Sequence, residues 1–542
     1  MRATDHTDHT EGRRARPHPF AASSVFSAVP LLFLALWLFP LVFLTWEAAG
    51  GGGRGVWWWL EQRAWQIAAR TTIEQAAMVA GLGFLAGWLP GVLTGLAPRG
   101  WRWMIQGLCA LPLLLPPFLW AVGWSFLQSQ APRRWYALFD GRWGMLCAGL
   151  AAAVPLVVLA SSADVSGISR AQWELVISRR GGWIARWLAA RRALPAAAGA
   201  AALAALLGAS DAGAGQIMGR HGMAGEVLVS LAARQDPGEA ATKSLAGAVL
   251  LLPLAALAAW MLTRAWRHLQ SGRGTLRGGA VPDKVRLDWL FAMFLAIVAL
   301  MALALPVMGF AGPLSRSRGD FHLREALTLW EKSLAPTLWY GLGGAVAAAA
   351  SGLAVATLAA RSKHRGAVLT FCLLALAVPS SLRALGWVAA GSHWSAARSL
   401  LGTEAGVAAA LGLQWMPLAV LLLTPALAAL PQSWDDRRRL AGVSRLTYLR
   451  RVLLPVLTPW LGVTIAATAL LVLADVTSLM LLQPPGRTAF TSHVFAVMDN
   501  SMEAVVASLC VALIVVPLIL GLLLLLCAAL AGRMQRHFSP AP

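Results

Sequence analysis

Three ionisable side chains interrupt long apolar stretches of the sequence: Asp211 in LLGASDAG, Asp475 in LLVLADVT, and Arg383 in the stretch 366–391. Such groups are costly in hydrocarbon unless paired, so they often line a path for ions or solutes. Each also has a structural interpretation. The carboxylates would suit helix ends in interfacial water, where they cap a turn. Arg383 would suit a salt bridge with Asp475, or a cavity for an anionic or metal-chelate substrate. All three are candidates for a translocation path.

Two prolines are further candidates for that path. Pro116 lies in the stretch 104–127 and Pro379 in the stretch 366–391. Proline lacks the backbone N–H that a helix interior needs, so we expect both helices to break or kink. Such breaks suit irregular pore-lining segments, although they are also common in passive membrane helices.

Several other kinds of chemistry are missing from the sequence. No lysine follows a glycine, so there is no GxxxxGK[ST] phosphate loop, and we expect no ATP binding by this chain. The 5 cysteines lie in apolar stretches without a CxxC pair, which is typical of inert reduced thiols. His221, His393 and His493 have no spacing that would form a metal site. We therefore expect no catalytic residue, and no metal or cofactor bound by this chain.

The composition indicates a membrane protein. The chain has 542 residues, of which 58% are hydrophobic and only 13% charged, whereas soluble domains carry about a quarter charged residues. Its net charge of +21 would suit nucleic acid, but the basic residues form short clusters between apolar runs. That placement is typical of a membrane orientation signal, so we expect membrane lipid and no nucleic acid as a partner. The first apolar run is longer than the core of a signal peptide, which favours a first span.

We expect about twelve transmembrane helices, because a bilayer core needs about 20 apolar helical residues. The stretches are 26–46, 73–96, 104–127, 144–163, 195–212, 241–263, 288–311, 336–360, 366–391, 404–430, 457–482 and 504–530. The face that holds the tails and most of the 45 Lys and Arg residues should be cytoplasmic. Localisation in a bacterial inner (plasma) membrane, with both termini cytoplasmic, follows as the expectation.

The sequence also predicts a tandem duplication. Three anchors recur in the same order at nearly the same separation along the chain. They are Pro116 with Pro379, Gly182 and Pro195 with Gly442 and Pro455, and Asp211 with Asp475. We expect a cytoplasmic tail at 1–25, a first half at 26–263, a linker at 264–287, a second half at 288–531 and a tail at 532–542. Both halves have six spans in the same orientation, which makes a parallel repeat.

The loop at 431–458 reads as an amphipathic, basic helix. Leu440, Val443, Leu446 and Leu449 recur at three-residue steps and would form one apolar face opposite a cationic one. A helix of this kind can lie on anionic lipid. Gly442 would permit a sharp bend, and we expect a proline at 455 to end the surface helix where the next span begins.

This loop resembles the cytoplasmic "EAA" loop of type I ABC importer permeases. In that motif an acidic residue and two alanines precede a glycine, and Leu-Pro follows. Here the acidic position falls on Asp436, the alanine positions on two arginines, the glycine on Gly442 and the end on Leu454 and Pro455. The first-half copy keeps Gly182, Leu194 and Pro195, but has Val176 at the acidic position. The first copy thus departs further from the motif.

The resemblance covers the whole chain and implies an all-α integral membrane protein made of two fused permease halves. It implies the transport subunit of an ATP-driven importer, which is not itself an enzyme. A homodimeric ABC ATPase would bind ATP and Mg²⁺ and dock on the two loops. A periplasmic or lipid-anchored solute-binding protein would deliver the solute. The PPG segment at 484–486, after Asp475, resembles the ferric-iron branch. Thiamine, phosphonate and polyamine permeases are the alternatives.

Two hypotheses from other classes stay open. A secondary transporter driven by an ion gradient would also have twelve spans in two halves, but it would need charged residues near the membrane midplane and no docking loop. A membrane scaffold or receptor would not depend on a solute. The matched loops favour the importer.

Overall fold

The computed structural model describes residues 24–50, 55–132, 134, 141–168, 170–271, 304, 307–316, 321–361, 365–428, 430, 432–498 and 501–538. Within these ranges the regular structure is helical and contains no strand. Helices suit apolar segments because they satisfy every backbone polar group internally. The expected tail at 1–25, most of the linker and most of the span 288–311 lie outside the described residues.

Several helices are long and apolar enough to cross a membrane. Eight qualify within the described residues, or ten if each of two bent pairs forms a single span. A shorter apolar helix covers Leu34–Gly50. The expectation of an all-α protein with several helices able to cross a membrane is thus confirmed for the described residues, whereas the number of twelve spans stays a prediction.

The first series of helices occupies the N-terminal half of the chain. It consists of α1 (Ser24–Gly50), α2 (Val56–Glu61), α3 (Arg63–Leu96), α4 (Arg99–Leu114), α5 (Pro117–Gln130), α6 (Gly141–Ser166), α7 (Arg170–Ala209), α8 (Ala212–Ile217), α9 (Met223–Ala232) and α10 (Pro237–Ser271). Several boundaries differ from expectation, and two of them bear on the predicted loops. Helix α7 begins far before 195 because the basic loop is itself helical, and α10 continues past 263 into the expected linker.

The second series follows helical residues 307–316. It consists of α12 (Phe321–Leu338), the π-helix η3 (Trp339–Gly343), α13 (Gly344–Arg361), α14 (Arg365–Ala377), α15 (Ser380–His393), α16 (Ser395–Leu401), α17 (Glu404–Ala428), α18 (Gln432–Leu440), α19 (Arg445–Tyr448), the π-helix η4 (Leu449–Leu453), α20 (Leu454–Ala474), α21 (Val476–Leu482), α22 (Phe490–Val497) and α23 (Glu503–Phe538). Helix α23 runs beyond 531, so the expected C-terminal tail begins as helix.

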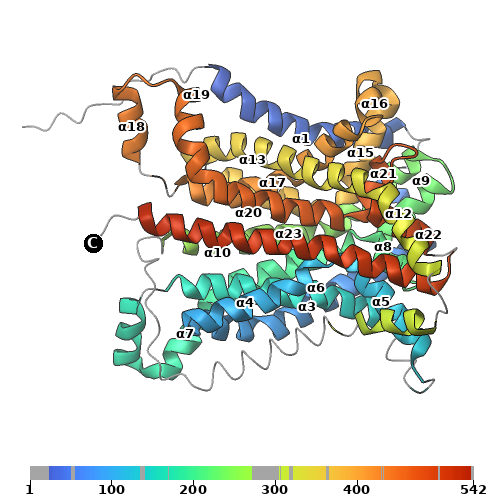
Figure 1. The fold of residues 1–542 in the computed structure, drawn as a ribbon, viewed down its shortest axis with the longest axis horizontal. Coiled ribbons are helices and arrows are strands. Elements are labelled where there is room, and N and C mark those ends of the chain that lie inside the picture. Colours follow the sequence, from blue (N-terminus) through green and yellow to red (C-terminus); the bar gives the residue numbers. More distant parts are fainter. Residues whose placement is uncertain are drawn as a thin grey trace, which may run out of the picture.

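The long helices lie side by side along one axis of the molecule (Figure 1). At one end are the short helices α18 and α19, together with the C-terminal end of α23. At the other end are α9, α16 and α22. The basic loops and the short helices α8 and α21 are therefore at opposite ends of the bundle.

Glycine permits the closest helix contacts. Helix α3 has glycines at every fourth position on the face toward α6. A Cβ at Gly87 would lie 2.7 Å from that of Val157, and a Cβ at Gly91 would lie 2.6 Å from that of Ser161. Helices α13 and α17 approach similarly, where Gly352 meets Ala419. Small residues at such steps let membrane helices pack without intervening side chains.

The two series of helices exchange their first members. Helix α1 packs along α15, where Pro40 lies against Gly386. Residues 307–316 pack on α5, where Gly309 lies against Gly123 and Gln130 Nε2 donates to the Gly309 carbonyl at 2.9 Å. The first segment of each series thus packs against a helix of the other series.

Candidate functional sites

Asp211 and Asp475 lie at equivalent breaks in two long apolar helices. Asp211 separates α7 from α8, and Asp475 separates α20 from α21. Each caps the short helix that follows: Asp211 accepts from the Gly213 N–H at 2.9 Å, and Asp475 from the Ser478 N–H at 3.1 Å. Aspartate is among the preferred N-cap residues. Helices α8 and α21 contact each other.

The Asp475 carboxylate is enclosed by side-chain donors. It accepts from Ser478 Oγ at 2.7 Å, Gln414 Nε2 at 2.7 Å and Ser380 Oγ at 3.1 Å, besides the N–H of Ser478. These donors satisfy both oxygens of the carboxylate. Asp475 thus joins α15, α17 and α21.

Arg383 contacts Asp475 only indirectly. Its Nη1 donates to the carbonyl of Gln414 at 2.7 Å, and the same glutamine donates to Asp475. The guanidinium also lies 5.8 Å from the Trp37 ring centre and 5.9 Å from that of Trp415, and Arg383 is 2% exposed. In the structure the Arg383 side chain is packed between two indole rings and backbone carbonyls, and no ion pair with Asp475 is found among the described residues.

Asp211 has different surroundings. Its carboxylate accepts from the backbone N–H of Gly213, in the helix that it caps. It borders a cavity lined by residues of α3, α6, α7, α8 and α9. The lining includes Thr71, Thr72 and Gln75 of α3. The two aspartates thus share a position in the fold but not an environment.

Pro116 and Pro379 lie at sharp bends. They immediately precede α5 and α15, where the helix axis turns by 80° between α4 and α5 and by 86° between α14 and α15. Helix α5 packs on α8, and α15 packs on α21. Each proline break is thus next to the helix capped by an aspartate.

The second basic loop forms an elbow. Helix α18 ends in a Schellman motif: the N–H of Gly442 bonds the carbonyl of Arg439 at 3.1 Å, and the N–H of Val443 bonds that of Arg438 at 3.1 Å. Gly442 has a φ of +63°, which glycine adopts without strain. Leu440 is 89% exposed on this elbow, and Asp436 on α18 is exposed as well.

Pro455 does not end the surface helix as expected. The backbone stays helical from α19 through η4 into α20, which begins at Leu454. A proline cannot donate to the carbonyl one turn earlier, and the wider π-turn of η4 absorbs that missing bond. Leu194 and Pro195 likewise lie inside the part of α7 that follows Gly181.

The first basic loop forms a second elbow, but its bend is one residue earlier than expected. Gly181, with φ 82°, interrupts α7, whereas Gly182 has no positive φ. Trp183 is 79% and Trp187 51% exposed beyond the bend. Arg192 lies 3.7 Å from the buried carboxylate of Asp164 on α6, which ties the elbow to the bundle.

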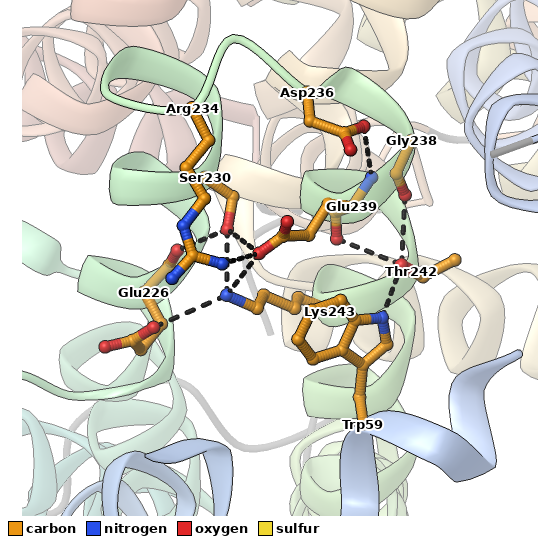
Figure 2. A network of polar contacts seen from close by, with 9 residues as sticks. All are labelled: Trp59, Glu226, Ser230, Arg234, Asp236, Gly238, Glu239, Thr242 and Lys243. Atoms are coloured by element: carbon orange, nitrogen blue, oxygen red, sulfur yellow. Dashed lines mark hydrogen bonds and ion pairs between the residues drawn. The ribbon is translucent and has the colours of Figure 1, made fainter. Parts of the chain in front are cut away.

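A buried charge cluster in the first half was not anticipated by the sequence (Figure 2). Lys243, 2% exposed, lies 2.8 Å from Glu239 and 3.4 Å from Glu226, and donates to Ser230 Oγ at 2.9 Å. Its ammonium is also 4.6 Å from the Trp59 ring centre. One contact of this cluster could have been predicted from the sequence, because Glu239 precedes Lys243 by one helical turn and such pairs lie on the same helix face. The cluster joins α9 to α10.

The histidines lie apart. His393 contacts Glu47 at 2.5 Å, and His493 on α22 approaches Thr488 at 3.3 Å. Burial, with a smaller effect of Lys332, lowers the pKa of His493, which favours its neutral form. Among the described residues no three His, Cys, Asp or Glu side chains are grouped to hold a metal ion.

No family model matches the chain, and no curated protein or solved structure does either. Function is therefore inferred from the residues and geometry described above.

Proposed function

We propose that the chain is the fused permease subunit of an ATP-driven importer, with two halves that form one translocation path. A separate homodimeric ATPase would hydrolyse ATP, and a solute-binding protein would deliver solute at the opposite face. In this proposal the protein lies in the bacterial inner membrane with both termini cytoplasmic.

The observation that carries the proposal is the pair of elbows. Each consists of a helix, a glycine with positive φ and a further helix that continues into a long apolar segment. Each also exposes large apolar side chains beside arginines, namely Trp183 and Leu440. Exposed apolar groups of this kind indicate a contact surface for a partner. Two such surfaces suit a partner with two equivalent subunits.

Helix order supports a duplicated six-span unit. The order of α3 to α10 recurs in α12 to α23: a long helix, a bent pair, a long helix, an elbow, a break at an aspartate, a short helix and a long final helix. The bend angles of 80° and 86° agree closely. A hydrogen bond from a backbone N–H to a threonine hydroxyl also recurs in the two halves. The Met223 N–H donates to Thr72 Oγ1, and the Phe490 N–H donates to Thr337 Oγ1.

The translocation path in this proposal lies where the two aspartate breaks meet. Helices α8 and α21 are in contact there, and each packs against one proline-broken pair. Short helices and breaks are tolerated in a membrane only where protein or water surrounds them. Rocking of the two halves would open this region to alternate faces.

Ferric iron is our proposal for the solute, and it rests on the PPG segment. Pro484 to Arg487 forms a turn closed by the Arg487 N–H at 3.2 Å, with Gly486 at φ +77°. Tyr340 Oη donates to the Arg487 carbonyl at 2.8 Å, which fixes the segment to η3. Uptake of radioactive ferric iron by cells that express the chain tests this assignment, and uptake equal to that of cells lacking it would reject iron.

Co-purification tests the importer proposal. The tagged chain would be isolated in mild detergent from its native host, and ATPase activity measured in the eluate. Leu440→Glu and Trp183→Glu place a charge on each elbow, while Met502→Glu changes a residue that is 60% exposed at the start of α23. We expect an ATPase with the wild type and the Met502 variant and its loss from the elbow variants. Equal ATPase activity in all eluates, or none with folded wild type, would refute the proposal.

A further inference from the structure

A buried ion pair connects the first elbow to the bundle. Asp164, near the end of α6, has a side chain that is 0% exposed, and its carboxylate lies 3.7 Å from Arg192 Nε on α7. The Arg192 guanidinium also reaches the end of α6, because its Nη2 lies 3.7 Å from the position that a Cβ at Gly167 would take. A cation at the C-terminal end of a helix is stabilised by the helix dipole. Arg192 thus binds α6 through a carboxylate and through the helix end.

Other contacts place both segments of this elbow against α3. Trp173, before the bend, and Ala189, after it, are buried in one apolar cluster with Leu96 of α3. Trp88 Nε1, also on α3, donates to the carbonyl of Ala190 at 2.9 Å. The ion pair therefore lies in a packed region where the elbow meets the ends of α3 and α6.

The position of Asp164 has an equivalent in the second half. Val157 of α6 packs on a glycine of α3, and Ala419 of α17 packs on a glycine of α13 in the same way. Two helical turns beyond Val157 lies Asp164, and the same step from Ala419 leads to Ala426. Ala426 is thus the counterpart of Asp164, and it carries no charge.

The position of Arg192 has an apolar equivalent too. Arg192 precedes Pro195 by the same number of residues as Val452 precedes Pro455. Val452 packs against the buried apolar cluster that contains Ala426. The two counterparts of the ion pair therefore belong to one cluster as well. The contact between elbow and bundle is ionic in the first half and apolar in the second.

These two kinds of contact differ in how they transmit a displacement. An apolar contact is non-directional, so the two surfaces can shift against each other while they stay in contact. A buried ion pair depends on both partners, because removal of one leaves an uncompensated charge, whereas replacement of both by apolar residues is often tolerated. The ion pair should therefore fix the first elbow relative to α6.

We propose that Asp164 and Arg192 are positioning residues for the transport cycle, which make the first elbow and α6 move together. The glycine contacts between α6 and α3 then extend the same movement to α3. The inference rests on the proposed importer function, since it assigns the route by which an ATPase that docks on the elbow displaces membrane-spanning helices. The second elbow acts through its apolar contact.

The purified complex of the full chain with its ATPase tests this role. Spin-labelled keto amino acids would replace Ala233 at the end of α9 and Ala396 in α16, which are both exposed and belong to different halves. This label leaves the 5 native cysteines unchanged. Pulsed EPR would measure the distance between the labels before and after trapping with ATP and vanadate. We expect this distance to change in the wild type, because the two halves rock against each other.

Variants separate movement from docking. Asp164→Ala and Arg192→Val should each reduce the distance change by about half or more, while the amount of bound ATPase stays at the wild-type level. The double variant reproduces the residues of the second half and should recover most of the change. It contains no charge left without its partner, so it also provides a test should the single variants fail to fold. Arg70→Met, at an exposed surface pair, is the control and should behave as wild type.

Three results would overturn the proposal. They are a full distance change in both single variants, a loss of bound ATPase that matches the loss of distance change, and a double variant that folds but shows less than half of the wild-type change. Absence of an ATPase, or of any distance change, in the wild type would refute the importer proposal itself, so the two failures are distinguishable.

Discussion

Replacing Lys243 with methionine should destabilise the end of the bundle where α9 meets α10. The ammonium is 2% exposed and contacts Glu239 at 2.8 Å, Glu226 at 3.4 Å and Ser230 at 2.9 Å. Lys243→Met keeps most of the apolar volume but leaves two largely buried carboxylates without this cation. Breaking a buried ion pair on one side costs about 3–5 kcal/mol.

For Lys243→Met we expect a loss of unfolding free energy at the lower end of this range, because Arg234 still contacts Glu239 after the change. The free energy of unfolding can be measured by titrating the protein with SDS in mixed micelles. A double variant, Lys243→Met with Glu239→Gln, should recover part of the loss because one uncompensated carboxylate is gone. Arg70→Met is the control, since Arg70 pairs with Glu74 at the surface and its side chain is 81% exposed. Wild-type stability of Lys243→Met, or a loss equal to that of Arg70→Met, would refute the interpretation of the cluster as a buried ionic joint.

Three further predictions concern the elbow, the polar link and the helix contacts. Gly181→Ala should strain the first elbow by about 1–3 kcal/mol, because φ 82° with ψ 162° is a conformation that essentially only glycine adopts. It should reduce ATPase co-purification, whereas Gly182→Ala should not, and equal effects would contradict the assigned bend. Gln414→Leu should lower the free energy of unfolding by about 1–3 kcal/mol, because the buried Asp475 carboxylate loses the hydrogen bond from Gln414. An unchanged free energy of unfolding in SDS would argue against this hydrogen bond as a stabilising contact. Gly91→Leu should prevent folding by separating α3 from α6, visible as aggregation on size-exclusion chromatography, and a monodisperse product would contradict the close contact.

Much of the helical architecture was predictable because its signals are local. Apolar stretches of sufficient length gave the long helices, and Pro116 and Pro379 marked the two sharp bends. Asp211 and Asp475 lie at helix breaks, where a polar side chain can satisfy free backbone N–H groups. These features depend on neighbours within a few residues, and such neighbours are visible in a sequence.

The polar connections were harder to predict because they join distant segments. Gln414 is a neutral residue in an apolar run, so nothing local indicates that it links Arg383 to Asp475. The first elbow illustrates a different limit: Gly181 and Gly182 are adjacent and both can adopt a positive φ, so the local sequence does not distinguish them. The two aspartates also differ in the side-chain donors around them. That difference depends on which residues of α3, α15 and α17 lie near each carboxylate.

Photo-crosslinking from the elbow in living cells tests the importer assignment most directly. A photoreactive amino acid would replace Leu440, which is 89% exposed, and in a separate strain Trp394, which is 50% exposed beside α16 at the opposite end of the bundle (Figure 1). We predict that position 440 captures a subunit whose sequence contains a GxxxxGK[ST] phosphate loop, and that position 394 does not. Failure of position 440 to capture any such subunit in cells that express the protein stably, or equal capture from position 394, would contradict an ATPase-driven permease.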